Sequence, residues 1–116
     1  MAAALFDAIE AGDIEAVRSL YAPDVVVWHN TDGKEQGADE NLRTLAWCVR
    51  HIRGMRYEDV RCFETPSGFV EQHTLRGTTG SGAELAVPAC LVVSVRDGLI
   101  ARIDEYLDSA QLAGLV

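Results

Sequence analysis

Glu105 is the residue whose place in the sequence points most directly to chemistry. In the stretch 99–107, which has the composition of a β-strand, Ala101, Ile103, Glu105 and Leu107 share one face, because successive strand residues point to opposite sides. Glu105 is the one carboxylate in this otherwise apolar row. Burial raises the pKa of a carboxyl group, and a carboxyl that titrates near neutral pH can act as a general acid or base. The alternative is a slipped register, or a glutamate at the sheet rim paired with an arginine.

His73 is the expected partner of that carboxylate. In a second predicted strand, 69–78, Phe69, Glu71, His73 and Leu75 share a face. The two apolar members indicate that this face points inward, which would bring His73 and Glu71 into the same interior. Histidine titrates near neutral pH and could exchange a proton with the carboxylate. Alternatively, His73 is a core histidine satisfied by a hydrogen bond, and Glu71 is solvated near the rim.

The stretch 25–30 forms another predicted strand, but its pattern does not decide which face is buried. Trp28 and Asn30 lie on one face and His29 on the other. We expect Trp28 to supply an apolar wall and Asn30 to donate a hydrogen bond to a substrate oxygen or to water. Trp28 could equally belong to the core, and His29 could be a surface residue, an interface residue or a ligand.

The elements that would position these residues make up an α+β domain. Apolar residues recur at helical spacing in three stretches, and Asp13 is a good N-cap for the second of them. Five other stretches are rich in β-branched and aromatic residues, and Asp97-Gly98 is a tight-hairpin signal. Because hairpin-connected strands are antiparallel, we expect the helices to pack on one face of a curved antiparallel sheet. The predicted helices are 2–11, 14–20 and 37–53, and the predicted strands are 25–30, 56–64, 69–78, 84–96 and 99–107.

The strand predicted at 84–96 is apolar on both faces. A strand covered on only one side should alternate with polar residues, so the second face also needs a cover. Since the helices occupy the first face, we expect a homodimer formed through the outer face of the sheet. Trp47 lies away from the apolar stripe of its helix, and is either a contact for another surface or tucked under the N-terminal segment.

The length and the charge exclude several classes of protein. A chain of 116 residues fits one domain. Its 10 Lys+Arg and 18 Asp+Glu give a net charge of −8, which repels phosphate backbones and anionic lipids, so we expect no nucleic-acid or membrane partner. The longest apolar run, 85–93, is much shorter than the roughly 20 residues of a membrane helix. The N-terminus has no basic region of the kind found in signal peptides.

The cysteines and the absence of several motifs bear on the cellular compartment and on cofactors. Cys48, Cys62 and Cys90 are odd in number and widely spaced, which favours free thiols in a reducing cytoplasm. Dinucleotide-binding, P-loop and nucleophile-elbow motifs are absent from the sequence. The three histidines also lack the spacing of a metal site. We therefore expect neither a cofactor nor a metal.

Four segments together resemble the SnoaL-like group of the nuclear transport factor 2-like superfamily. They are AIEAGDIEAVRSLYAPDVVVWHN, DGKEQGADEN, FVEQHTLRGT and VRDGLIARIDEYLD, and the resemblance covers nearly the whole chain. It implies a cone-shaped fold, in which a long bent antiparallel or mixed sheet wraps around a cavity, N-terminal helices cover its concave face, and the protein is usually a dimer. The superfamily includes ketosteroid isomerases, polyketide cyclases, dehydratases, epoxide hydrolases and non-catalytic modules, so the fold alone does not define the function.

The resemblance also suggests roles for individual residues. In the limonene-epoxide hydrolase branch, a Tyr-x-Asn pair on the first strand and an acid before the final tyrosine hold the attacking water. Trp28, Asn30 and Glu105 stand at those places. The Arg-x-Asp of that branch is replaced by Glu71 and His73, which argues against the same hydrolytic machinery. In the polyketide-cyclase branch, one acid near the position of Glu105 serves as both acid and base.

These observations predict a small-molecule enzyme with general acid–base chemistry on an apolar, oxygenated substrate in the cone cavity. The reaction would be that of an isomerase, a cyclase or a hydrolase. Glu105 and His73 are the expected catalytic residues, and Trp28, Asn30 and Glu71 the expected substrate-binding residues. The alternative is a non-catalytic small-ligand-binding or dimerisation module of the same fold.

Overall fold

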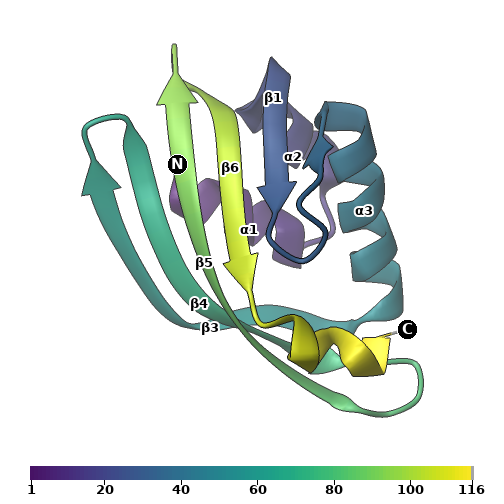
Figure 1. Ribbon diagram of the computed structural model, residues 1–116. Coiled ribbons are helices and arrows are strands. Elements are labelled where there is room, and N and C mark those ends of the chain that lie inside the picture. The colour runs from purple at the N-terminus through teal and green to yellow at the C-terminus, as the bar shows by residue number, and fades with distance from the viewer. Residues whose placement is uncertain (116) are drawn as a thin grey trace.

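The computed structural model describes residues 1–115, in which three helices lie on one side of a six-stranded sheet (Figure 1). A 3-10 helix follows the last strand. The helices are α1 (Ala2–Glu10), α2 (Ile14–Leu20), α3 (Ala38–His51) and the 3-10 helix η1 (Ser109–Leu115), and the strands are β1 (Tyr21–His29), β2 (Glu35–Gln36), β3 (Arg53–Thr65), β4 (Gly68–Thr78), β5 (Glu84–Arg96) and β6 (Leu99–Leu107).

The sheet has the strand order β2-β1-β6-β5-β4-β3. The strands from β3 to β6 form a meander of antiparallel neighbours, and β1 pairs with β6 in parallel. The turn between β5 and β6 is made by Asp97 and Gly98, whose φ angles are 53° and 78°. Both angles lie in the left-handed region, as a two-residue hairpin of this type requires.

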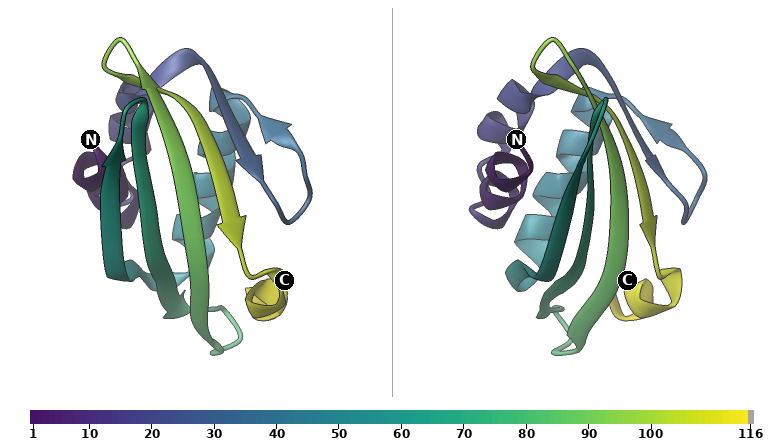
Figure 2. Two further views of the ribbon diagram at one scale, coloured as in Figure 1. Left: turned by 60° about the vertical axis from the view of Figure 1, so that its left-hand side comes forward. Right: turned by 90° about the vertical axis from the view of Figure 1, so that its left-hand side faces the viewer.

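The helices cover the concave side of the bent sheet (Figure 2). Helix α2 begins at its expected cap, since the side chain of Asp13 accepts a hydrogen bond of 3.1 Å from the backbone of Ala16. The main core lies between the helices and the sheet, and a smaller apolar cluster lies around the end of α3. The main core includes Leu5, Phe6, Ile9, Val17, Val25, Leu42, Leu91 and Ile103, and the smaller cluster includes Ile52, Leu85 and Val87.

The predicted α+β class is confirmed, together with a curved mixed sheet whose concave side the helices cover. Strand β1 begins earlier than the predicted strand 25–30, because Ala22, Pro23 and Asp24 belong to it. The β1–β6 register is nevertheless irregular between Tyr21 and Val26, since proline cannot donate to a ladder. Strand β2 and the parallel pairing of β1 were not predicted. Among the described residues, no helix has the length and apolar character needed to cross a bilayer.

Candidate functional site

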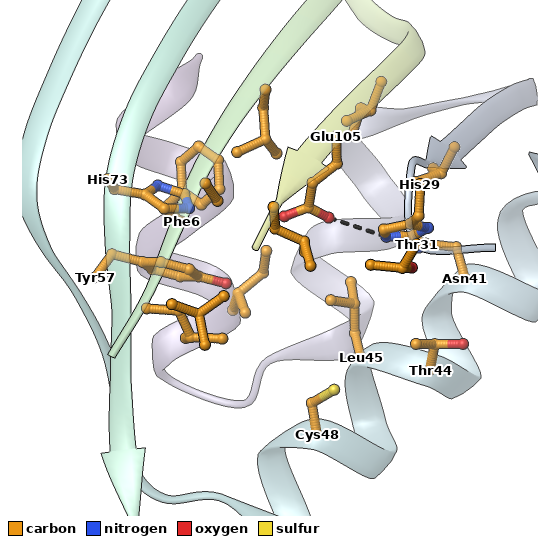
Figure 3. Close-up of a pocket in the computed structure, with 18 of the residues that line it drawn as sticks. Phe6, His29, Thr31, Asn41, Thr44, Leu45, Cys48, Tyr57, His73 and Glu105 are labelled. Atoms are coloured by element: carbon orange, nitrogen blue, oxygen red, sulfur yellow. Dashed lines mark ion pairs between the residues drawn. The ribbon is translucent and has the colours of Figure 1, made fainter. Parts of the chain in front are cut away.

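A cavity of about 260 Å³ lies between the concave face of the sheet and the helices. Most of its wall is apolar, and the polar side chains gather beside β1 and α3. Figure 3 shows His73 and Tyr57 on one side of the cavity and His29 with Asn41 on the other. The polar residues on the β1 and α3 side are Tyr21, His29, Thr31, Asp32, Gln36, Asn41 and Thr44.

Glu105 points into this cavity and pairs with His29 (Figure 3). The two residues are direct neighbours in the parallel β1–β6 ladder, so their side chains emerge on the same face. The distance from His29 Nε2 to Glu105 Oε1 is 2.9 Å, and the side chains are 19% and 20% exposed. The hydrogen bond to Glu105 raises the pKa of His29 against the opposing effect of burial. The pair is therefore a shielded carboxylate held by an imidazole that tends to keep its proton.

A second histidine–carboxylate pair lies behind the opposite wall. His73 Nδ1 is 2.6 Å from Glu71 Oε2, and these side chains are 1% and 3% exposed. The His73 ring packs against Phe6 and Tyr57, with ring centroids 5.0 and 4.4 Å apart. Burial raises the pKa of Glu71, and the hydrogen bond from His73 opposes that rise. Glu71 contacts His73 but is not one of the residues that line the cavity. This corrects its expected placement in contact with a substrate.

Glu105 and His73 both line the cavity, as the strand patterns suggested, but each forms its ion pair with a different residue. The sheet order explains why. Strand β5 separates β6 from β4, and Leu91 lies between Glu105 and Glu71 in register. Because neighbouring strands are about 4.8 Å apart, the two carboxylate positions are separated by roughly 10 Å. The expected Glu105–His73 pair is thus replaced by two separate pairs.

Trp28 and Asn30 lie on the opposite face of β1, which corrects their expected placement in the pocket. The Trp28 ring packs edge-on against Tyr106, with centroids 5.1 Å apart. The Asn30 side chain accepts a hydrogen bond from the backbone N–H of Leu107 at 2.9 Å and donates one to its carbonyl at 3.2 Å. The alternation of the strand requires this, because His29 points inward. Asn30 therefore ties β1 to the end of β6.

The polar side of the cavity holds a hydrogen-bond network that was not predicted from the sequence. The Tyr21 hydroxyl donates to Asn41 Oδ1 at 2.7 Å, and Asn41 donates to Gln36 Oε1 at 3.0 Å. Gln36 in turn donates to the Thr44 hydroxyl at 3.1 Å. A signal for Asn41 was present, because it lies three residues after Ala38 on the apolar stripe of the helix. A polar residue inside such a stripe indicates a buried hydrogen bond.

Trp47 is partly exposed on α3 and stacks on His51, with ring centroids 4.2 Å apart. It therefore contacts its own helix and keeps an exposed surface. Within residues 1–115, no three histidine, cysteine or acidic side chains lie together in a metal-binding arrangement.

The Glu105–His29 pair predicts a pH-dependent contribution to stability. A raised pKa in the folded state stabilises the protein below the unfolded value near 6.5, and that contribution is lost as the pH rises through the folded pKa. We expect His29→Asn to lower the free energy of unfolding by about 1–2 kcal/mol at pH 6 and by less at pH 9. Urea unfolding at both pH values measures this. An equal loss for His29→Asn at both pH values would contradict the prediction.

The sequence model of the SnoaL-like domain family matches residues 2–103. No curated protein matches the sequence. Several solved structures share the fold. A suggested polyketide cyclase from Pseudomonas putida KT2440 has a TM-score of 0.85 at 24% identity, covering 99% of this chain and 94% of that one.

Two further structures support the same fold. A protein of unknown function related to nuclear transport factor 2, from Burkholderia pseudomallei K96243, has a TM-score of 0.85 at 22% identity, covering 99% and 93% of the two chains. A hypothetical protein with a ketosteroid isomerase-like fold from Catenulispora acidiphila DSM 44928, in complex with trimethylamine, has a TM-score of 0.85 at 15% identity, covering 98% and 89%. At these identities the likeness establishes the shared fold.

Proposed function

Because the chain belongs to the SnoaL-like domain family, we propose that it is a small-molecule enzyme using Glu105 for general acid–base chemistry. The family and the fold are those of small-molecule binding or catalytic modules. One observation carries the finer proposal: a carboxylate held by His29 points into a mostly apolar cavity. A carboxylate placed in this way can remove a proton from a bound molecule while bulk water is largely excluded.

His29 would hold the carboxylate in place during the reaction. Its Nε2 contacts one oxygen of Glu105 at 2.9 Å, which leaves the second oxygen available to a ligand. The contact also fixes the orientation of the carboxylate, which is the group that would act as the base. The reaction would begin with removal of a proton beside a carbonyl, or from a water that attacks the substrate. His73 would face the ligand from the opposite wall.

A panel of candidate compounds can test this function before the substrate is identified. Ketones, epoxides and polyketide-like esters are incubated with the protein in D2O, and NMR follows both conversion and exchange of carbon-bound hydrogen. We expect at least one compound to exchange or react faster with the wild type than with the Glu105→Gln variant, which leaves the buried His73–Glu71 pair intact. Equal rates for both proteins across the whole panel would reject the enzymatic proposal and favour a binding module.

The outer face of the sheet supports a proposed homodimer. Phe63, Val92 and Tyr106 are 49%, 41% and 50% exposed, and Trp28 lies on the same face beside Tyr106. The register places Phe63, Val70, Val92 and Asp104 in one row across β3, β4, β5 and β6. The row is apolar at Phe63, Val70 and Val92, and Tyr106 with Trp28 adds aromatic surface beside Asp104. Exposed apolar surface of this kind is typical of a protein interface, and a second copy presents the same surface.

Sedimentation at tens of micromolar protein tests the dimer. We expect the wild type to sediment as a dimer and Tyr106→Glu to sediment as a monomer, because the variant would bury an unpaired negative charge from each copy in an apolar interface. Trp47→Glu is the matched control, since it changes an exposed aromatic residue on α3 and should leave the dimer intact. A monomeric wild type would contradict the proposal.

The three cysteines bear on the proposed location. Cys48, Cys62 and Cys90 are free thiols. Disulfides persist in oxidising compartments, and thiols are kept reduced in the cytoplasm. The cysteines thus support a cytoplasmic protein.

A further inference from the structure

The cavity between the sheet and the helices has a polar side and an apolar side, and both of its carboxylates belong to the polar side. Glu105 reaches this side from β6 through its pair with His29, and Asp32 follows in the turn after β1. The opposite wall carries the rings of Phe6 and Tyr57, with centroids 5.0 Å apart (Figure 3). A molecule that fills the cavity therefore meets carboxylates at one end and apolar rings at the other.

The charges that line the cavity do not balance. Glu105 and Asp32 are negative, and a protonated His29 compensates only one of them. No lysine or arginine of the described chain lines the cavity. The buried His73–Glu71 pair adds no positive charge, because a cationic pair would need both groups protonated on side chains that are 1% and 3% exposed. The lining therefore carries at least one uncompensated negative charge.

The negative charge of Glu105 acts across the whole cavity. Burial raises the pKa values of Tyr21, Cys48 and Tyr57, and the charge of Glu105 raises all three further. These side chains line the cavity from β1, α3 and β3, and with raised pKa values they stay uncharged at neutral pH. An anionic ligand would thus increase the negative charge, a neutral ligand would leave it unchanged, and a monovalent cation would compensate it.

An organic cation fits this lining better than a metal ion does. Among residues 1–115, no three histidine, cysteine or acidic side chains lie close enough together to hold a metal. The neighbouring amide oxygens are already used, since Asn41 Oδ1 accepts from Tyr21 and Gln36 Oε1 accepts from Asn41. The Glu105 oxygen that does not contact His29 remains as a charged acceptor. It suits a cation with an N–H group, because hydrogen bonds between two charged groups are stronger than those between neutral groups.

The volume of the cavity limits the size of the ligand. A water molecule occupies roughly 30 Å³ in the liquid, so a cavity of about 260 Å³ has the room of about nine waters. A ligand with on the order of ten non-hydrogen atoms fills such a space at the packing density of a protein interior. This corresponds to one ring that carries a short aminoalkyl chain.

We propose that the cavity binds a small primary or secondary amine in its protonated form, with the ammonium group beside Glu105 and the apolar body against Phe6 and Tyr57. The inference rests on the proposed function for the location of the site and adds the charge class of its ligand. The ammonium donates an N–H to the free oxygen of Glu105, while His29 keeps the other oxygen. Asp32 supplies the second negative charge. The net charge of −8 also attracts cations to the protein.

Two probes of nearly the same shape test the charge of the ligand. Benzylamine is protonated at neutral pH and has a ring and a short chain within the size limit, and benzyl alcohol replaces its ammonium group by a neutral hydroxyl. Calorimetric titration at pH 7 and about 0.15 M salt, where distant charges are screened, gives both affinities. We expect the wild type to bind benzylamine at least about tenfold more tightly than benzyl alcohol.

Glu105→Gln shows whether this preference depends on the carboxylate. We expect the variant to bind benzylamine about 10- to 100-fold more weakly, the value of a hydrogen bond to a charged group. Benzyl alcohol should stay within about threefold, because glutamine also accepts a hydrogen bond. Glu64→Gln is the matched control, since it removes an exposed carboxylate that does not line the cavity, and it should change neither affinity. An equal weakening of benzylamine in both variants would assign the preference to the net charge and contradict the site.

His29 provides a second readout in the wild type, without a substitution in the cavity. The charged groups that act on it are Glu105 on β6 and Asp32 in the turn after β1. An ammonium that shares the Glu105 carboxylate with His29 should lower the pKa of the imidazole, so the His29 signals in a 15N-histidine NMR titration should move to lower pH with benzylamine. Benzyl alcohol should leave them in place, and His29→Asn identifies these signals. A His29 titration that saturating benzylamine leaves unchanged would overturn the proposed contact.

The possible results separate this inference from the proposed function. Equal affinities of the two probes for the wild type, or no binding of benzylamine at millimolar concentration, would overturn the assigned ligand class. The Glu105-dependent exchange of uncharged compounds in D2O would then still be decided by its own panel. Conversely, Glu105-dependent binding of benzylamine without exchange of any panel compound would support this inference and reject only the catalytic role.

Discussion

Glu105→Gln is expected to reduce turnover by about 10²- to 10⁴-fold, the usual contribution of a positioned general acid or base. Glutamine has nearly the same size and can still accept a hydrogen bond from His29 Nε2, so the cavity should keep its shape. It cannot accept a proton from the substrate. The measurement is kcat, or the rate of hydrogen–deuterium exchange at the reactive carbon, with whichever compound the D2O panel identifies.

Two companion variants make the result specific to this carboxylate. Glu105→Asp keeps the acid but shortens its reach by one methylene, and should retain more activity than Glu105→Gln. Glu64→Gln removes an exposed carboxylate on β3 and should react at the wild-type rate. If Glu105→Gln keeps full activity, or if Glu64→Gln loses as much, Glu105 is not the base.

His73→Leu is expected to lower the free energy of unfolding by about 3–5 kcal/mol at pH 8, as measured by urea unfolding. The leucine leaves Glu71 without its only ion-pair partner among residues 1–115, at a site where the carboxylate side chain is 3% exposed. Burial already raises the pKa of Glu71, and His73 opposes that effect. Removal of His73 should therefore raise this pKa further and favour the protonated, uncharged acid.

The pH dependence of this loss distinguishes an unpaired charge from a simple packing defect. A carboxyl whose folded pKa lies above its unfolded value destabilises the protein as the pH rises through the interval between the two. The deficit of His73→Leu should accordingly shrink as the pH falls toward 4.5. The double variant Glu71→Leu/His73→Leu has no buried charge to compensate and should recover much of the stability at pH 8. A deficit that is the same at both pH values would contradict this account.

The inward placement of Glu105, Glu71 and His73 followed from the sequence because β4 and β6 are long strands with clear turn signals. Asp97-Gly98 fixes the hairpin that leads into β6, and the period of two then determines which residues share a face. The same local rules recovered the ends of β5 and the cap of α2. Short-range patterns were sufficient for the strands from β4 to β6, which are neighbours both in the chain and in the sheet.

The partner of Glu105 could not be found in this way. Strand β1 pairs in parallel with β6, and no local pattern in the sequence records which distant strand it will join. Its valines lie on both faces, so the pattern did not show that His29, and not Trp28, points inward. The family resemblance matched Trp28 and Asn30 to residues of a related site. The actual placement became visible only once the register of the β1–β6 ladder was known.

The position of β1 in the sheet also has a consequence for how the protein folds. Strand β1 joins the meander only through β6, and Asn30 bonds to Leu107 across 77 positions of the chain. Closing so long a loop costs entropy before any contact rewards it, and such contacts slow folding. His29 and Glu105 can therefore meet only after the segment carrying β6 has left the ribosome, so during synthesis the inner wall of the cavity stays incomplete until that segment is available.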